Sequence, residues 1–219
     1  MAWRWAAALL VLGLTTVKAE DDLAPGKFLV AGRDLRDPNF AEAVVLLVDY
    51  DADHGAMGLI INRRTDVPLS KVFTDLKEAK NRTDPVYLGG PVELNSVLAL
   101  IKSTVNPGEA KRVFGDLYLV NTKGQMQKAL AERTEASSFH VFVGYAGWGE
   151  SQLEHEVDLG AWHVMSAESA LVFHTDPDSI WQRLIKRTEQ QIASLPDPAA
   201  HSARKVSSGP ALVARLAGK

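Results

Sequence analysis

The chain contains no cysteine among its 219 residues. Without thiols it has no disulfides, thiol nucleophiles, iron–sulfur clusters or cysteine zinc sites, and no cysteine to which a lipid anchor could be attached. The compartment stays open on this evidence, because a domain of this size can be stable without disulfides.

Catalytic motifs are missing as well. The chain has no G-x-S-x-G, no P-loop and no H-E-x-x-H. The segment Gly144–Trp148 lies between a predicted strand and a predicted helix, where phosphate loops occur, but it lacks the G-x-G-x-x-G spacing and the Walker lysine. We interpret it as a tight turn that needs glycine, and we predict neither a catalytic residue nor a cofactor.

Basic charge is scarce, with 24 Lys and Arg against 27 Asp and Glu and a formal net charge of −3. Loss of the first nineteen residues would remove Arg4 and Lys18 and bring this charge to −5. Nucleic-acid-binding proteins usually carry a basic patch. The pair Arg63-Arg64 is the best local candidate, and it supplies only two charges. The composition therefore argues against nucleic acid as a partner.

The N-terminus has the three-part layout of a secretory signal. A short start with Arg4 precedes the apolar run Ala6–Leu14, and Val17-Lys18-Ala19 is a small-x-small cleavage pattern. The run is too short to cross a bilayer, which takes about 20 apolar residues. We therefore predict a signal peptide over residues 1–19, cleaved after Ala19, and a periplasmic or secreted protein. The alternative, a cytoplasmic protein with an N-terminal helix, is weakened because the run has no polar face.

The remaining chain divides into a domain and a tail. Hydrophobic residues make up 46% of the sequence, which is enough for a packed core. We predict one domain over residues 20–195. Residues 196–219 are rich in Ala, Ser, Pro and Gly and are predicted to form a flexible C-terminal tail.

Hydrophobic periodicity predicts short strands interspersed with helices. The expected strands are Phe28–Ala31, Ala43–Val48, Met57–Ile61, Val86–Leu88, Val97–Ile101, Leu117–Val120, Phe139–Val143, Trp162–Met165 and Leu171–Phe173. The expected helices begin at Pro68, Gly124, Glu150 and Asp176. Hairpins alternate with helices without a regular βαβ rhythm, so the pattern predicts an α+β fold with a mixed sheet and helices packed outside.

The run Glu154-His155-Glu156 is the most suggestive cluster of titratable residues. Neighbouring helix residues point in different directions, so these three side chains are not expected to share a metal ion or to form an acid/base pair. Gln152 and Glu156 do share a helix face. We expect Glu156 to satisfy a buried backbone group or an arginine. The tryptophans at 148, 162 and 181 are expected in the core.

Several segments taken together resemble the AlgH/YqgE family. They are Gly26–Ala31, Asp37–Phe40, Val44–Leu47, Gly55–Arg63, Val86–Val92, Gly144–Trp148, Gln152–Glu156 and Gly160–Trp162. The resemblance extends over roughly residues 26–189 and implies a compact α+β domain on a mixed, barrel-like sheet. The resemblance implies no established catalytic residue. It does imply a link to transcriptional regulation of alginate production.

This sequence departs from the family pattern at three places. Tyr50-Asp51 replaces the usual His-Asp, and Arg63-Arg64 replaces the usual Pro or Lys-Pro after the asparagine. Family members also usually begin near Gly26 without a leader. A real leader would exclude a direct role at DNA for this protein.

A groove between the three motif loops is the predicted ligand-binding site. Its residues are polar or glycine and lie at strand ends, where pockets form: Asn62, Arg63, Gly89, Gly90, Tyr145, Trp148, Gln152 and Glu156. The favoured function is an exported, non-enzymatic binding or regulatory module for a protein or small-molecule partner. The alternatives are a small-molecule-binding protein or enzyme that uses this groove, and a transcriptional regulator.

Overall fold

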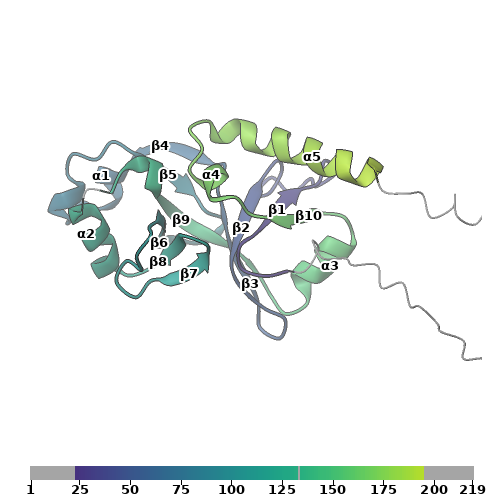
Figure 1. Cartoon of the computed structure of the whole chain (residues 1–219), viewed down its shortest axis with the longest axis horizontal. Helices are drawn as coiled ribbons and strands as arrows, with labels where there is room; N and C mark the ends of the chain where they lie inside the picture. Colours follow the sequence, from purple (N-terminus) through teal and green to yellow (C-terminus); the bar gives the residue numbers. More distant parts are fainter. Residues whose placement is uncertain (1–22, 133, 195–219) are drawn as a thin grey trace, which may run out of the picture.

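The computed structural model describes residues 23–132 and 134–194 of the chain (Figure 1). The predicted signal peptide and the predicted tail at 196–219 lie outside the described residues. Within the described part, no helix combines the length and apolar character needed to cross a membrane.

The strands of the described residues form one strongly curved sheet (Figure 1). They are β1 (Lys27–Ala31), β2 (Val44–Asp51), β3 (Gly55–Ile60), β4 (Arg64–Pro68), β5 (Pro85–Leu88), β6 (Val92–Lys102), β7 (Lys111–Phe114), β8 (Leu117–Val120), β9 (Phe139–Trp148) and β10 (Trp162–Ser166). The α-helices are α1 (Leu69–Val72), α2 (Lys123–Ala131), α3 (Gln152–Asp158), α4 (Ser169–Val172) and α5 (Ile180–Ser194). Single 3-10 turns are η1 (Lys77–Ala79), η2 (Ala136–Ser138) and η3 (Pro177–Ser179).

The sheet is mixed, as predicted. Its main path runs β10-β1-β2-β3-β9-β6-β8-β7 through antiparallel pairs, whereas β5 pairs in parallel with β9 and antiparallel with β4. The ten-residue strand β9 joins both halves of the sheet. The α+β class with a mixed sheet is therefore confirmed.

The sheet curls until its far end approaches its beginning. Lys111 on β7 forms an ion pair with Asp49 on β2 at 2.7 Å. Phe114 at the end of β7 packs so closely on Gly26 that a Cβ there would lie 2.8 Å from the Phe114 Cβ. These contacts are made by side chains, so the curve is a half-barrel, and this confirms the barrel-like sheet.

Two apolar cores lie on opposite faces of β6, β8 and β9. Alternate residues of a strand point to opposite faces, and accordingly Phe142 belongs to the larger core while Val141 belongs to the smaller one. The larger core lies under α5 and α3, and the smaller core lies under α1 and α2. The run Val44–Val48 is fully buried, as its unbroken apolar character predicted.

Three expected helices are present with altered bounds, and the one expected to begin at Asp176 is the 3-10 turn η3 followed by α5. The helix expected from Gly124 to Glu132 is α2, and Thr122 begins it with a capping box in which its hydroxyl accepts from the Gln125 N–H. The helix expected to begin at Glu150 begins at Gln152, and Gly160 follows it with φ +76°, the left-handed conformation that glycine commonly supplies at a helix end.

The helix expected after Pro68 ends after one turn. The apolar stripe that predicted it is still buried, with Leu69, Phe73 and Leu76 in the smaller core. The helix stops because Phe73 leaves the helical conformation at φ −106° and ψ +64°. Thr74 and Asp75 follow, and both residue types are poor in helix interiors.

Two further expectations need correction. Leu171–Phe173 was predicted as a strand, and residues Ser169–Val172 instead form α4, a single turn with Leu171 and Val172 buried. A short apolar run fits a buried helical turn as well as a strand, and periodicity does not separate them. The apolar spacing of the last helix groups Ile192 with Ile180, Trp181, Leu184 and Ile185, yet Ile192 is 54% exposed whereas the other four are buried.

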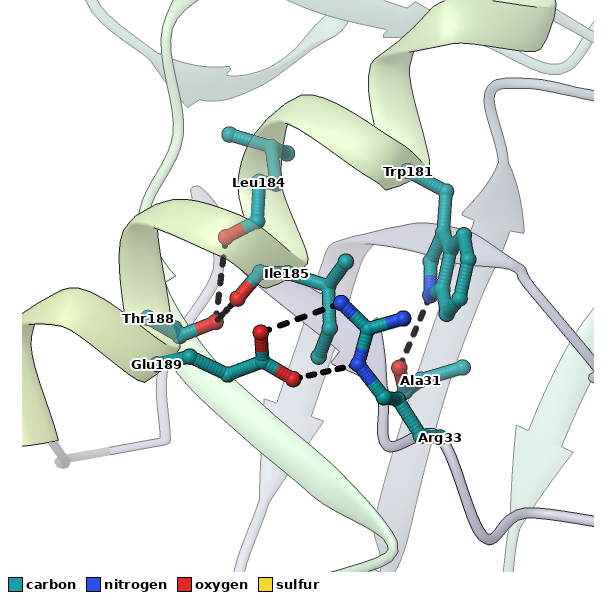
Figure 2. Close-up of polar contacts among 7 residues, drawn as sticks. All are labelled: Ala31, Arg33, Trp181, Leu184, Ile185, Thr188 and Glu189. Atoms are coloured by element: carbon teal, nitrogen blue, oxygen red, sulfur yellow. Dashed lines mark hydrogen bonds and ion pairs between the residues drawn. The ribbon is translucent and has the colours of Figure 1, made fainter.

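The last helix is held on the sheet by one polar cluster (Figure 2). The Trp181 indole N–H donates to the Ala31 carbonyl at 2.8 Å. Arg33 binds both carboxylate oxygens of Glu189, at 2.5 and 3.0 Å, and lies 5.7 Å from the centre of the Trp181 ring. The Ala31 carbonyl is available because its expected ladder partner, the Ala43 N–H, donates to the Phe40 carbonyl instead. Trp181 thus replaces a lost ladder hydrogen bond.

Candidate functional site

Asn62 joins the end of β3 to the chain segment that leads into β2. Its side-chain oxygen accepts from the Val44 N–H at 2.8 Å, and its side-chain nitrogen donates to the Glu42 carbonyl at 2.9 Å. Glu42 has a left-handed backbone with φ +57°, which is uncommon outside glycine. Both ends of the Asn62 amide are therefore used to hold this turn.

Arg63 holds the same segment at residues that precede Glu42 in the chain. We call residues 37–42 the strap. The Arg63 guanidinium donates to the carbonyls of Pro38 and Ala41, at 3.2 and 3.3 Å. Burial lowers the Arg63 pKa, and the charge of Asp37 opposes this change. Its charge is thus directed into the protein's own strap.

The strap carries Phe40 into an aromatic cluster with two tryptophans. The ring centre of Phe40 lies 6.1 Å from Trp148, nearly parallel to it, and 5.5 Å from Trp162, edge to face. The two indoles meet edge to face at 5.9 Å. Such aromatic pairs contribute about 0.5–1.5 kcal/mol each beyond the area they bury. Trp148, Trp162 and also Trp181 are buried, as predicted.

The Glu156 carboxylate closes this cluster. One oxygen accepts from the indole N–H groups of Trp148 and Trp162, at 3.0 and 2.7 Å, and the other accepts from the Gln152 amide at 2.9 Å. Gln152 and Glu156 therefore share a helix face, as predicted. The expectation of a backbone or arginine partner was wrong, because two indoles and an amide take that place.

Glu154 points to a different part of the molecule, as its helix position predicted. It accepts a hydrogen bond of 2.7 Å from the hydroxyl of Tyr50 on β2. This bond, together with burial and the Glu154 charge, raises the pKa of Tyr50 to about 12. The residue that replaces the usual family histidine thus ties α3 to the β2–β3 hairpin.

The predicted glycine residues lie where three strands converge. The Gly89 carbonyl accepts from the Ile60 N–H at 2.8 Å, and the Gly89 N–H donates to the Val143 carbonyl at 2.9 Å. A Cβ on Gly89 would lie 2.3 Å from the Gly144 carbonyl oxygen, and a Cβ on Gly90 would lie 2.2 Å from the Tyr145 backbone. These glycines permit close approach of β5 to β9.

The three motif loops do converge, although each predicted residue is engaged with its own chain. Asn62 and Arg63 hold the strap, and Gly89 and Gly90 pack against the backbone of residues 143–146. Trp148, Gln152 and Glu156 form the aromatic cluster, and Tyr145 is half-buried against the larger core. Ligand binding by these eight residues stays a prediction.

Sequence reasoning missed two residues of this arrangement. Phe40 was quoted only as a motif position, and Trp162 only as a motif position and a core residue. The available signal was the motif itself, because Asp37-Pro38 fixes a turn that can present the aromatic side chain two residues later. Among the described residues, no group of three His, Cys, Asp or Glu side chains could hold a metal ion.

The geometry defines a class of protein: an α+β half-barrel whose motif loops are joined through a carboxylate-capped aromatic cluster. Solved structures share this fold. The AlgH protein of Pseudomonas aeruginosa superposes with a TM-score of 0.62 at 28% identity, over 85% of this chain and 95% of that one. A Corynebacterium diphtheriae protein reaches a TM-score of 0.64 at 24% identity, over 82% and 91% of the two chains, and shows the fold alone.

Sequence comparison gives the family. A model described as AlgH-like (DUF179) matches residues 28–193. A "UPF0301 protein" of Streptomyces avermitilis is 36% identical over 180 residues, which cover 77% of this chain and 88% of that protein. Another, from Anaeromyxobacter dehalogenans, is 32% identical over 174 residues, or 75% and 87% of the two chains. The chain belongs to the AlgH-like family, a family of uncharacterised function.

Proposed function

We propose that the protein is a non-enzymatic binding or regulatory module that acts after export from the cytoplasm. Its binding surface is the one formed by the three motif loops around the aromatic cluster. The partner is a protein or a small molecule that contacts the outer side of this surface, where Gln152 and the backbone of Gly147 and Gly149 are exposed.

One observation supports a non-enzymatic role above the others. Glu156 is the carboxylate at the centre of the aromatic cluster, and it already accepts three hydrogen bonds from Trp148, Trp162 and Gln152. A general base must reach the proton of a substrate, whereas both oxygens of this carboxylate already accept from donors of the protein. A carboxylate used to join two buried indoles serves the structure of the surface instead.

Export is supported by the sequence of residues 1–19, and a role at DNA is disfavoured by the position of Arg63. Because that guanidinium donates to the strap carbonyls, Arg64 is left as the exposed member of the pair. A single exposed arginine is a poor phosphate-binding patch, since non-specific affinity for DNA depends on many such contacts.

The first test is the intact mass of the natively expressed protein combined with cell fractionation. We expect a mature chain that begins at Glu20 and is found outside the cytoplasm. An uncleaved chain in the cytoplasm would contradict export and reopen the regulatory role beside nucleic acid.

The second test separates a structural from a catalytic Glu156. We expect Glu156→Gln to lower the thermal stability of the purified protein, because an amide is a weaker acceptor for two indole N–H groups than a carboxylate. Any loss of function in cells should follow the loss of folded protein. A variant with unchanged stability and abolished function would overturn the non-enzymatic reading. Lys71→Gln, an exposed change on α1, is the control expected to alter neither.

A further inference from the structure

The strand pair β4–β5 contains an irregular bulge. Its ladder positions are Arg64 opposite Tyr87 and Pro68 opposite Pro85, so three residues of β4 lie against the single residue Val86. The Thr65 hydroxyl stabilises this arrangement, because it donates to the Val86 carbonyl at 2.7 Å and accepts from the Val67 N–H at 3.2 Å. Bulges of this kind redirect side chains and often lie beside binding sites.

An open depression of about 290 Å³ lies over the bulge. Six residues line it: Arg64, Thr65, Asp66, Pro68, Thr83 and Pro85. The two prolines are conformationally restricted and give it fixed walls. Its volume is at the lower end of the roughly 300–1,000 Å³ typical of ligand pockets, which points to a ligand of a few heavy atoms.

Two opposite charges in this lining have no partner within the described ranges, 23–132 and 134–194. Neither Arg64 nor Asp66 forms an ion pair or a side-chain hydrogen bond there, and they do not pair with each other. The adjacent Arg82 and Asp84 behave differently and form an ion pair at 2.5 Å. The depression is thus lined by one guanidinium and one carboxylate that have no ion-pair or side-chain hydrogen-bond partner among the described residues.

A buried polar group lies on the strand next to β5. His140 precedes Val141, the partner of Val86 in β5, so it lies beside Pro85 in the sheet. The His140 ring is buried, stacks on Tyr87 at 4.5 Å, and its Nδ1 atom has no hydrogen-bond partner in the described part of the chain. Buried polar atoms nearly always have a partner, so an unpaired one needs an explanation.

The pKa values of His140 and Tyr87 are also shifted. Burial lowers the His140 pKa to about 4 and raises the pKa of Tyr87, with Arg64 and Asp178 close enough to act on the phenol. Residues paired directly across strands point to the same face, so Arg64 lies on the same face as Tyr87. Buried groups with shifted pKa values, on strands next to an open depression lined by charged residues, are a combination expected at a binding site.

The two free charges select the class of ligand. A simple anion would be attracted by Arg64 and repelled by Asp66, and a simple cation would meet the reverse. We propose that this depression binds a small zwitterion of the α-amino acid class, with its carboxylate on Arg64, its ammonium group on Asp66 and the Thr83 hydroxyl as a further partner. This site is separate from the motif-loop surface, so it goes beyond the function proposed above and can fail independently of it.

The test is an NMR titration of the ¹⁵N-labelled protein with three probes of matched size at neutral pH. L-alanine carries both charges, propionate carries only the carboxylate, and ethylamine carries only the ammonium group. We expect L-alanine to give saturable shift changes confined to residues 64–68, 83–87 and 140. Each single-charge probe should bind about tenfold more weakly or worse, because each loses one charge-assisted contact.

Two variants and one control complete the experiment. Arg64→Gln and Asp66→Asn should each weaken L-alanine binding about tenfold or more, and both are exposed positions whose change leaves the fold intact. Arg36→Gln, an exposed arginine before the strap, should leave binding unchanged. The proposal is overturned if L-alanine produces no saturable shifts at these residues, if propionate or ethylamine binds equally well, or if either variant binds like the wild type.

Discussion

Polar side chains at the motif-loop end of the half-barrel and those at the β4–β5 bulge are arranged in opposite ways. At the motif loops, Asn62 and Glu156 use every side-chain oxygen or nitrogen they have on the protein's own chain. At the bulge, Arg64 and Asp66 have no partner among the described residues.

This difference shows that a cluster of motif residues and a site with free binding capacity need not coincide. A hydrogen bond already made within the protein must be broken before a ligand can use the same atom, and the broken bond offsets the new one. Motif residues whose side-chain oxygens and nitrogens already bond to the protein therefore indicate a structural role. The following predictions test this division, beginning with the largest expected effect.

Replacing an indole of the aromatic cluster should have the greatest effect. We expect Trp148→Ala and Trp162→Ala each to lower the free energy of unfolding by about 3–5 kcal/mol, the usual cost of truncating a core aromatic. Urea denaturation measures this change. Trp148→Phe is the matched control, because it keeps a ring against Phe40 and loses chiefly the bond to Glu156, worth about 1.5–3 kcal/mol. An equally stable Trp148→Ala protein that no longer binds its partner would instead place Trp148 in a binding site.

His140 should make stability depend on pH. Its pKa is about 4 in the folded protein, below the value near 6.5 of an unfolded chain. As pH falls through 6.5 toward 4, the unfolded chain takes up the proton and the folded protein does not, so the free energy of unfolding decreases. The full decrease approaches about 3 kcal/mol, since one pKa unit corresponds to about 1.4 kcal/mol.

The measurement is the difference between wild type and His140→Phe in thermal unfolding from pH 7 to pH 4.5. The variant should lose stability less steeply, because it lacks the buried imidazole whose pKa burial lowers. His155→Gln, an exposed change on α3, should keep the wild-type slope. Parallel curves for wild type and His140→Phe would show that His140 is protonated equally in both states.

Asn62 should contribute measurably to the free energy of unfolding, although it lies at the end of a strand. Asn62→Ala leaves the Val44 N–H and the Glu42 carbonyl without their partners, which we expect to cost about 1–3 kcal/mol in chemical denaturation. Asn39→Ala is the matched control, because Asn39 is exposed in the same strap and its change should stay within about 0.5 kcal/mol. Equal effects of the two variants would mean that Asn62 does not hold the strap.

The fold was largely predictable from local patterns, and the reasons are physical. The run Val44–Val48 indicates a buried strand because every residue in it is apolar. Gly160 indicates the end of a helix because few other residue types accept its left-handed conformation. The strand prediction for Leu171–Phe173 was wrong because three apolar residues show too little periodicity to distinguish a strand from a helical turn. The half-barrel closure was inferred only from family resemblance, since the contact of Gly26 with Phe114 is distant in sequence.

The candidate sites were less predictable. Sequence spacing placed Gln152 and Glu156 on one helix face, but the indole partners of Glu156 lie outside the helix and no local rule indicates them. The depression was missed altogether. It depends on a bulge that sets three residues against Val86, and register is decided by the partner strand, not by β4 alone.

The smallest effect is expected at the bulge, and it completes the comparison. Arg64→Ala should change the free energy of unfolding by no more than about 0.5 kcal/mol, because it removes an exposed side chain without a partner in the described structure. Arg82→Ala, eighteen positions along the chain, should cost more, about 1–3 kcal/mol, since it leaves the partly buried Asp84 carboxylate unpaired. Equal losses would mean that Arg64 also has a structural partner, and its charge would then not be free to bind a zwitterion. A stable Arg64→Ala protein would agree with the unpaired charge on which the proposed zwitterion site depends.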